Sequence, residues 1–355
     1  MKRFFRVVLA LVMAMSLMVA AIGCQQKSNS ESSSAKAESS STDSSGTKEV
    51  VKVICPYGVG GTADAICRKY AKVAGGLFPE YEFVVEQKTG GDGFVGAAYF
   101  QNIDQNAKEL FLLGYGNAYR YELGKTFGTE EVPYDLSAFK PLACVDDRTW
   151  ILYANPGDTL EDIIEKAKAG NLKMSGGNPL SDPHLTLGSL LAVEGGKVTV
   201  VSYDGGAAQK QGLSNGEVDV FVGTTQAGME EVEAGTLIPV LAFSENPYEG
   251  LVGPDGPITV PGLVNNGHAA LNPNKDYSGS ILPAGGFLAG RTGMDQAWAD
   301  KVVEISKEVW NAPEFSDWIS EIGLNRLEIY GDDAQAAMDS GIEKAVNAFE
   351  LLSGK

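Results

Sequence analysis

A short glycine-rich turn is the part of the sequence best suited to bind an anion. Gly58, Gly60 and Gly61 follow an apolar run and precede Thr62 and Asp64, either of which is expected to cap the helix that comes next. A turn between a strand and a helix gathers backbone N–H groups at the helix N-terminus, where they can hold a carboxylate or a phosphate. We therefore expect a negatively charged group of a ligand to bind here.

The same turn has two other interpretations. Residues 58–63 fit the dinucleotide-binding pattern G-x-G-x-x-A, and Glu82 and Glu86 lie close enough to the next strand to be candidate ribose ligands. The turn could also be purely structural, with glycines present only for their backbone angles. The turn alone does not decide between these alternatives.

The surrounding chain predicts alternating strands and helices. Apolar runs indicate strands, and helical patterns with capping residues follow them, which is typical of an α/β fold with mainly parallel sheets. In such a sheet the ligand crevice lies at the carboxyl ends of the strands. The expected strands are 50–55, 81–87, 110–113, 150–154, 171–174, 198–202, 218–222, 237–243 and 280–289. The expected later helices are 296–310, 313–322 and 333–352, while 245–274 is expected to be a long surface excursion.

The start of the chain resembles an export signal. Lys2, Arg3 and Arg6 precede an apolar run over 7–21 that is too short for a membrane span of about twenty residues. The sequence Ala-Ile-Gly before Cys24 resembles a lipobox, in which the cysteine becomes the lipidated first residue; an ordinary signal peptide is the alternative. Residues 1–23 are thus a predicted lipoprotein signal peptide, and the Ser-rich residues 24–47 a predicted disordered tether.

Charge and cysteine content restrict the possible partners. The formal net charge is −18, and loss of the three signal-peptide cations makes it −21. A surface of this sign argues against nucleic acid or anionic lipid as a partner. Cys55, Cys67 and Cys144 match no zinc pattern, so we expect no metal site, and the first two are expected to be core residues.

A hydrolase motif occurs in the wrong context. Residues 212–216 match G-x-S-x-G, but a predicted helix precedes them and a strand follows, the reverse of a nucleophile elbow. Gly216 is therefore expected to end a helix in the left-handed conformation. His184 and His268 are the only histidines, which leaves little material for general-base chemistry. We expect no enzyme activity and no cofactor.

Several motifs together resemble one receptor family. Pro133-Tyr134-Asp135 is followed by Phe139 and Pro141, and the first turn combines Pro56-Tyr57, Gly60-Gly61, Asp64 and Arg68. In these motifs the chain resembles the TctC or Bug solute-binding proteins of tripartite tricarboxylate transporters. The resemblance implies a two-lobed periplasmic-binding-protein-like (Venus-flytrap) fold. Lobe 1 would hold 48–142 and 243–355, and lobe 2 would hold 143–242.

The resemblance also implies which residues bind the ligand. The glycine-rich strand ends of the two lobes would face each other, although Asp204 replaces a lysine that is usual in the family, and the aspartate usual near 223–225 is absent. The implied ligand-binding residues are Tyr57, Gly58, Gly60, Gly61, Thr62, Asp64, Tyr115, Asn117, Ser175, Gly176, Gly177, Asn178, His184, Tyr203, Gly205, Gly206 and Thr224.

These observations favour a receptor over an exported or nucleotide-binding enzyme. Two lobes would close on a small organic acid and present it to the membrane subunits of the transporter, with a monomeric receptor anchored in the lipid bilayer through Cys24. No Lys or Arg lies between Pro56 and Asp64 or between Ser175 and Pro183. The sequence therefore predicts that backbone N–H groups, rather than side-chain cations, hold the carboxylate.

Overall fold

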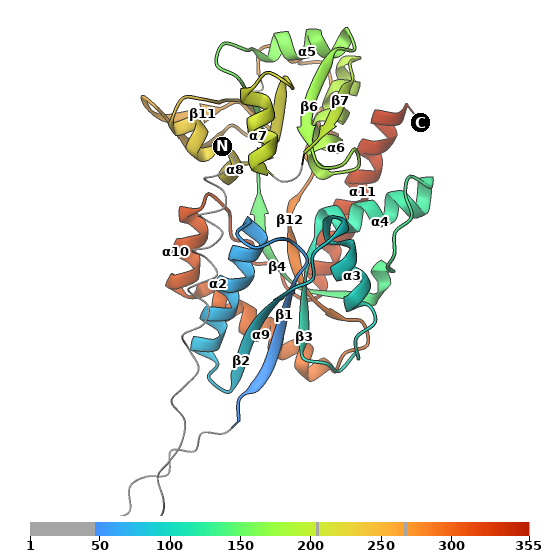
Figure 1. The fold of residues 1–355 in the computed structure, drawn as a ribbon, viewed down its shortest axis with the longest axis vertical. Helices are drawn as coiled ribbons and strands as arrows, with labels where there is room; N and C mark the ends of the chain where they lie inside the picture. Colours follow the sequence, from blue (N-terminus) through green and yellow to red (C-terminus); the bar gives the residue numbers. More distant parts are fainter. Residues whose placement is uncertain (1–46, 204–205, 266–267, 355) are drawn as a thin grey trace, which may run out of the picture. The chain divides into compact units, whose positions relative to one another are not determined.

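The structure is a computed structural model that describes residues 47–203, 206–265 and 268–354. The predicted signal peptide, Cys24 and nearly all of the predicted tether lie outside these residues, as do Asp204 and Gly205. Within the described residues, two five-stranded sheets each carry helices on both faces, and these two layered bodies are called lobe 1 and lobe 2 below (Figure 1). The α/β two-lobed architecture predicted from the sequence is confirmed, but both sheets are mixed rather than mainly parallel, since half of their strand pairings are antiparallel.

Lobe 1 is built on a mixed sheet with strand order β2-β1-β3-β12-β4. β1 pairs in parallel with β2 and β3, while β12 is antiparallel to both β3 and β4. The strands are β1 (Glu49–Cys55), β2 (Tyr81–Gln87), β3 (Glu109–Gly114), β4 (Phe139–Arg148) and β12 (Ala284–Arg291). The helices are α2 (Thr62–Leu77), α3 (Phe94–Phe100), α4 (Tyr115–Phe127), α9 (Gln296–Asn311), α10 (Pro313–Glu321) and α11 (Asp332–Ser353).

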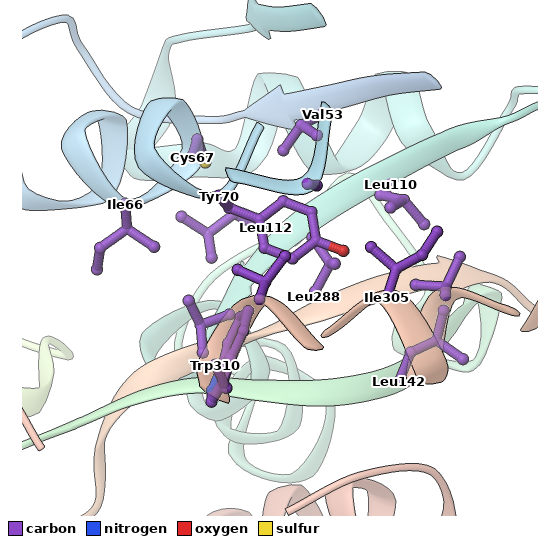
Figure 2. Close-up of a cluster of buried hydrophobic side chains, with 14 of the residues drawn as sticks. Val53, Ile66, Cys67, Tyr70, Leu110, Leu112, Leu142, Leu288, Ile305 and Trp310 are labelled. Carbon is purple, nitrogen blue, oxygen red and sulfur yellow. The ribbon is translucent and has the colours of Figure 1, made fainter. Parts of the chain in front are cut away.

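The central strand β3 is buried on both faces, which explains why it is a continuous apolar run, whereas the edge strand β2 alternates between half-buried and exposed residues. Leu110 and Leu112 of β3 face α2, α9 and α10, whereas Phe111 and Leu113 face α3, α4 and α11. Figure 2 shows the first of these cores, where the ring of Tyr70 lies between the strand side chains and Trp310. The predicted helices 296–310 and 313–322 are present as α9 and α10, and their apolar side chains, such as Ile305 and Phe315, are buried in this core. Cys55 and Cys67 are buried free thiols, as predicted.

Lobe 2 repeats this plan with strand order β7-β6-β8-β5-β9. β6 is parallel to β7 and β8, and β5 is antiparallel to β8 and β9. Gly216 has a φ of +73° after α7, as predicted for a helix end. The strands are β5 (Trp150–Ala154), β6 (Leu172–Gly176), β7 (Val198–Ser202), β8 (Val220–Thr224) and β9 (Ile238–Ala242). The helices are α5 (Leu160–Lys168), α6 (Asp182–Glu194), α7 (Gly206–Ser214) and α8 (Thr225–Glu233).

Within the described residues the chain crosses between the sheets twice, and both crossings come later than predicted: β4 keeps 143–148 in the lobe 1 sheet, and the return comes after residue 243. The segment after β9 forms a hairpin, β10 (Tyr248–Gly253) and β11 (Gly256–Val260), rather than a bare surface excursion. Leu251, Val260, Leu263 and Leu271 are buried against the lobe 2 sheet. The chain therefore rejoins lobe 1 only at β12, because the apolar side chains of this segment complete the core of lobe 2.

The last helix connects the two lobes. α11 packs against α4 of lobe 1 and against α6 of lobe 2. At Gly188 of α6, an added Cβ would lie 2.2 Å from Cδ1 of Leu352, so glycine allows α11 to approach. Within the described residues, no helix is both long enough and apolar enough to span a membrane.

Candidate functional site

A cavity of about 400 Å³ lies between the lobes, a size suited to a small organic ligand. Lobe 1 contributes the residues after β1 and β3 together with β12, and lobe 2 contributes the residues after β6 together with α7. The predicted crevice at the carboxyl ends of the strands is thus present. The lining residues are Tyr57, Gly61, Thr62, Ala63, Asp92, Leu112, Gly114, Gly116, Arg120, Arg148, Trp150, Gly176, Gly177, Ser181, Asp182, Pro183, Gln209, Gly285 and Gly286.

The glycine-rich turn after β1 is only partly in this cavity. Gly61 and Thr62 line it, whereas Gly58 and Gly60 are solvent-exposed outside it. The N–H of Gly60 donates to the carboxylate of Asp64 at 3.0 Å, so the protein itself supplies the anion for that donor. Gly61 is the N-cap of α2 without any side-chain cap, which corrects the prediction that Thr62 or Asp64 caps the helix.

Two arginines, which the loop motifs did not predict, line the cavity. Arg120 is fully engaged: Nε and Nη2 bind Glu130 at 2.7 and 2.6 Å, Nη1 is 3.4 Å from Asp92, and the guanidinium lies 3.9 Å from the ring centre of Phe94. A bidentate pair of this kind fixes the guanidinium in one orientation. Arg120 is thus held as part of the wall.

Arg148 is engaged on one side only. Its Nε and Nη2 bind the fully buried carboxylate of Asp146, the latter at 3.2 Å. Within the described residues no hydrogen bond uses Nη1, and Arg148 lines the cavity. The charged run Asp146-Asp147-Arg148 ends β4 and separates its apolar part from the apolar strand β5. That charged run in an otherwise buried segment is the sequence signal that could have identified this cation.

Further polar groups of the cavity lack partners. Nε1 of Trp150 and Oγ of Ser181 are buried, and neither has a hydrogen-bond partner in the described part of the chain. Leaving a buried donor unpaired costs about 1–3 kcal/mol, so such groups are suited to bonds with a ligand or with water. Tyr57 differs, because its hydroxyl donates to Oδ1 of Asn117 at 2.8 Å.

Asp182 lies in the first turn of α6, at the boundary between the lobes. Its Oδ1 would be 2.7 Å from a Cβ added at Gly116, so the glycine in α4 permits this close approach. Burial is the largest cause of a rise in the pKa of Asp182 to about 7; the charge of Asp92 adds to the rise, and the backbone N–H of Asp182 itself, Arg148 and Arg120 oppose it. Within the described residues no Lys or Arg forms an ion pair with Asp182.

Several predicted ligand-binding residues lie outside the cavity lining. Asn117 is behind Tyr57 and donates to the carbonyl oxygen of Asp92 at 3.1 Å. Tyr115 packs on Phe287, with ring centres 4.8 Å apart. The imidazole of His184 bonds to the carbonyl oxygen of Pro179, and its burial lowers its pKa.

The remaining predictions divide in the same way. Tyr57, Gly61, Thr62, Gly176 and Gly177 are the predicted residues that line the cavity. Other predicted ligand-binding residues do not line the cavity: Asp64, Ser175, Asn178, Tyr203, Gly206 and Thr224. Within the described residues, no group of His, Cys, Asp and Glu side chains could hold a metal ion.

Comparisons with known proteins identify the fold. No protein-family model matches the chain, and neither does any curated protein. Among solved structures, Rpa4515 from R. palustris with adipate has a TM-score of 0.68 at 18% identity, over 86% of this chain and 98% of that one. The periplasmic binding protein BugD has a TM-score of 0.68 at 20% identity, over 86% and 98%. MatC from Rhodopseudomonas palustris with bound malate has a TM-score of 0.67 at 16% identity, over 86% and 99%.

This chain has the fold of the TctC/Bug-type solute-binding proteins. At these identities the likeness extends to the fold and no further. The resemblance inferred from the sequence motifs is confirmed at that level.

Proposed function

We propose that this protein is an extracytoplasmic solute receptor that captures a small organic acid between its lobes. The observation that carries the proposal is the interlobe cavity lined by the glycine turns after β1 and β6 and by Arg148, whose Nη1 has no partner within the described residues. A guanidinium in a closed cavity binds a carboxylate strongly, because weak dielectric screening strengthens the bond. Adipate and malate, the ligands named for two structures of the same fold, are small carboxylates.

The receptor is further proposed to be lipid-anchored through Cys24 and to deliver its ligand to the membrane subunits of a tripartite tricarboxylate-type transporter. The lipobox-like sequence supports the anchor, and the shared fold supports the transporter class. Expressed in a bacterium, Cys24→Ser should leave the membrane fraction or remain unprocessed. A mature, membrane-bound Cys24→Ser protein would rule out this anchor.

The geometry gives no support to the nucleotide alternative. Gly58 and Gly60 lie outside the cavity, and the Gly60 N–H that a pyrophosphate would need is bound to Asp64. Glu86, a candidate ribose ligand, pairs with Lys52 at 3.4 Å and with Lys88 at 2.5 Å.

A thermal-shift screen of the purified protein against organic acids, amino acids and nucleotides tests the receptor function. A ligand at a hundred times its dissociation constant should stabilise the protein by about 2.7 kcal/mol, which raises the melting temperature by several degrees. A response to nucleotides alone would contradict the proposal.

The role of Arg148 is tested with a paired variant, because Arg148→Gln alone would leave the buried Asp146 without its cation. Arg148→Gln combined with Asp146→Asn removes both charges together. The double variant should bind the acid found in the screen about 10- to 150-fold more weakly, the equivalent of one lost charge-assisted hydrogen bond. Asp146→Asn alone is the control and should retain binding, since it keeps the guanidinium. Equal affinities of the two variants would show that Arg148 does not hold the ligand.

A further inference from the structure

The charges around the cavity do not suit a ligand that is only anionic. Arg120 and Arg148 face four carboxylates, those of Asp92, Asp182, Glu130 and Asp146. With all six groups ionised, the site has a net charge of −2. A dicarboxylate would bring two more negative charges into a chain whose formal charge is already −18.

Within this set, Asp182 is the carboxylate without a cation of its own. Glu130 and Asp92 pair with Arg120, and Asp146 pairs with Arg148. Asp182 lies against Gly116 on the opposite lobe and contributes to the cavity wall. It also occupies the N-terminus of α6, where a ligand carboxylate would otherwise find backbone donors. Part of the cavity is therefore suited to a cationic group.

The cavity also offers one guanidinium edge for an anion. Nη1 of Arg148 is unused within the described residues, and the indole N–H of Trp150 lies unpaired in the same wall. Within the described residues, the cavity thus contains a cation with an unused donor and a carboxylate without a cationic partner. A ligand that carries both charges would satisfy both.

We propose that the ligand is a small amino acid or a related amino-carboxylate, which places its ammonium group on Asp182 and its carboxylate group on Arg148. The inference rests on the proposed receptor function and specifies its ligand class. The adipate and malate named for two structures of the same fold carry no amine. Specificity would arise because a deaminated acid leaves Asp182 buried without a cation.

The effect of pH distinguishes this ligand from a plain acid. An ammonium group binds only the ionised form of Asp182, whose pKa is about 7 without ligand. Affinity for an amino acid should therefore rise roughly thirtyfold between pH 5.5 and pH 8, a range in which the amine stays protonated. A dicarboxylate would instead need the protonated form as a donor, so its affinity would fall over the same range.

The other groups that face Asp182 are two arginines, two tyrosines and Asp92. Arg120 and Arg148 remain protonated. Burial raises the phenol pKa values of Tyr57 and Tyr119 well above neutrality, so both stay uncharged. Asp92, the remaining carboxylate that faces Asp182, pairs with Arg120. The slope of affinity with pH is thus assigned to Asp182.

Isothermal titration calorimetry of the full chain with matched probes tests the inference. The pairs are L-aspartate with succinate, L-glutamate with glutarate, L-alanine with propionate, and L-leucine with 4-methylpentanoate, so that the members of each pair differ by the amine alone. At pH 8 at least one amino acid should bind at least tenfold more tightly than its deaminated partner. Equal or tighter binding of the deaminated acids would overturn the inference but preserve the receptor function. Binding of neither set would contradict both.

Asp182→Asn and Asp332→Asn provide the matched variants. Both aspartates are the first residue of a helix, but Asp332 of α11 is exposed and outside the cavity. Asp182→Asn should weaken amino-acid binding at least tenfold and remove its dependence on pH, whereas Asp332→Asn should change neither. If Asp182→Asn binds the amino acid as well as the unaltered protein does, Asp182 does not receive the ammonium group.

Discussion

The two glycine-rich turns that approach the cavity each lead into a helix with an aspartate in its first turn, and the two aspartates differ sharply. Asp64 of α2 is buried and accepts hydrogen bonds from Arg68 at 3.0 Å, from the N–H of Gly60 at 3.0 Å and from Gln87. Burial alone would raise its pKa, but these donors outweigh burial and hold the pKa below the usual range. For Asp182 of α6 burial prevails, and the pKa rises to about 7.

The difference separates a structural carboxylate from one that is available to a ligand. The carboxylate of Asp64 accepts hydrogen bonds from groups of the protein itself, and its bond to the N–H of Gly60 holds the turn after β1 in place. Asp182 has its backbone N–H and the charges of Asp92, Arg120 and Arg148 around it, but within the described residues no cation forms an ion pair with it. Similar sequence patterns therefore give opposite shifts of the aspartate pKa, because the groups around each carboxylate differ.

The largest expected effect is on folding stability. Asp64→Asn weakens the hydrogen bonds that a buried carboxylate accepts from three donors, and the loss should be about 3 kcal/mol, the upper value for hydrogen bonding to a charged group, because the half-exposed Arg68 stays solvated. Asp182→Asn should cause no loss at pH 7, since it neutralises a carboxylate that burial already disfavours. Urea unfolding of the two variants measures both values. Equal destabilisation would show that Asp182 is also a structural carboxylate.

A second, smaller effect is the dependence of stability on pH. A carboxyl group whose folded pKa is raised stabilises the fold while it is protonated, and this contribution is lost as pH rises through the folded pKa. Asp182 should therefore reduce the ligand-free stability by roughly 2 kcal/mol between pH 5 and pH 7. Asp147, whose pKa burial raises to about 6, acts in the same direction.

The Asp182→Asn variant separates the contributions of Asp182 and Asp147 to the pH dependence of stability. Denaturation curves of Asp182→Asn should lose the Asp182 part of the slope and keep the Asp147 part. Asp64 works with the opposite sign, because its pKa is lowered, and its stabilisation is lost only as pH falls through acidic values. A pH profile of Asp182→Asn identical to that of the unaltered protein would contradict the raised pKa.

Much of the fold could be predicted because its signals are local. The apolar runs of β1 and β3, the cap of α5 at Thr159 and the left-handed Gly216 depend on neighbouring residues. The hairpin after β9 was harder to predict from the sequence, since the glycines and prolines of this segment suggest a surface loop. Its Leu251 and Val260 are buried only because lobe 2 has an apolar face at that point.

The site was less predictable because its charges come from separate parts of the chain. Motifs identified turn residues such as Gly61 and Gly177, which do line the cavity. Arg148 lies on the crossing between lobes, far in sequence from both turns, and only the folded chain brings it to them. Tyr115, next to a lining glycine, is directed into the core by its packing on Phe287. Adjacency in sequence did not indicate which side chains face a ligand.

The smallest expected effect concerns a contact between the lobes at the rim of the cavity. Thr62 begins α2 beside the turn after β1, and its hydroxyl donates to Oε1 of Gln226 in α8 of lobe 2. The hydrogen bond joins residues that belong to different lobes, so it exists only while the lobes are closed. Thr62→Val keeps the shape of the side chain and removes the donor.

Thr62→Val, Gln226→Leu and the double variant form a cycle that measures this bond. The coupling energy should be about 0.5–1.5 kcal/mol, the net value of one hydrogen bond. Because the contact forms after the ligand has entered, its loss should appear as faster dissociation, at most about tenfold, with little change in the association rate. Stopped-flow fluorescence of the lining residue Trp150 can follow both rates. Unchanged dissociation in all three variants would show that closure depends on the ligand and on the packing of α11 rather than on this rim contact.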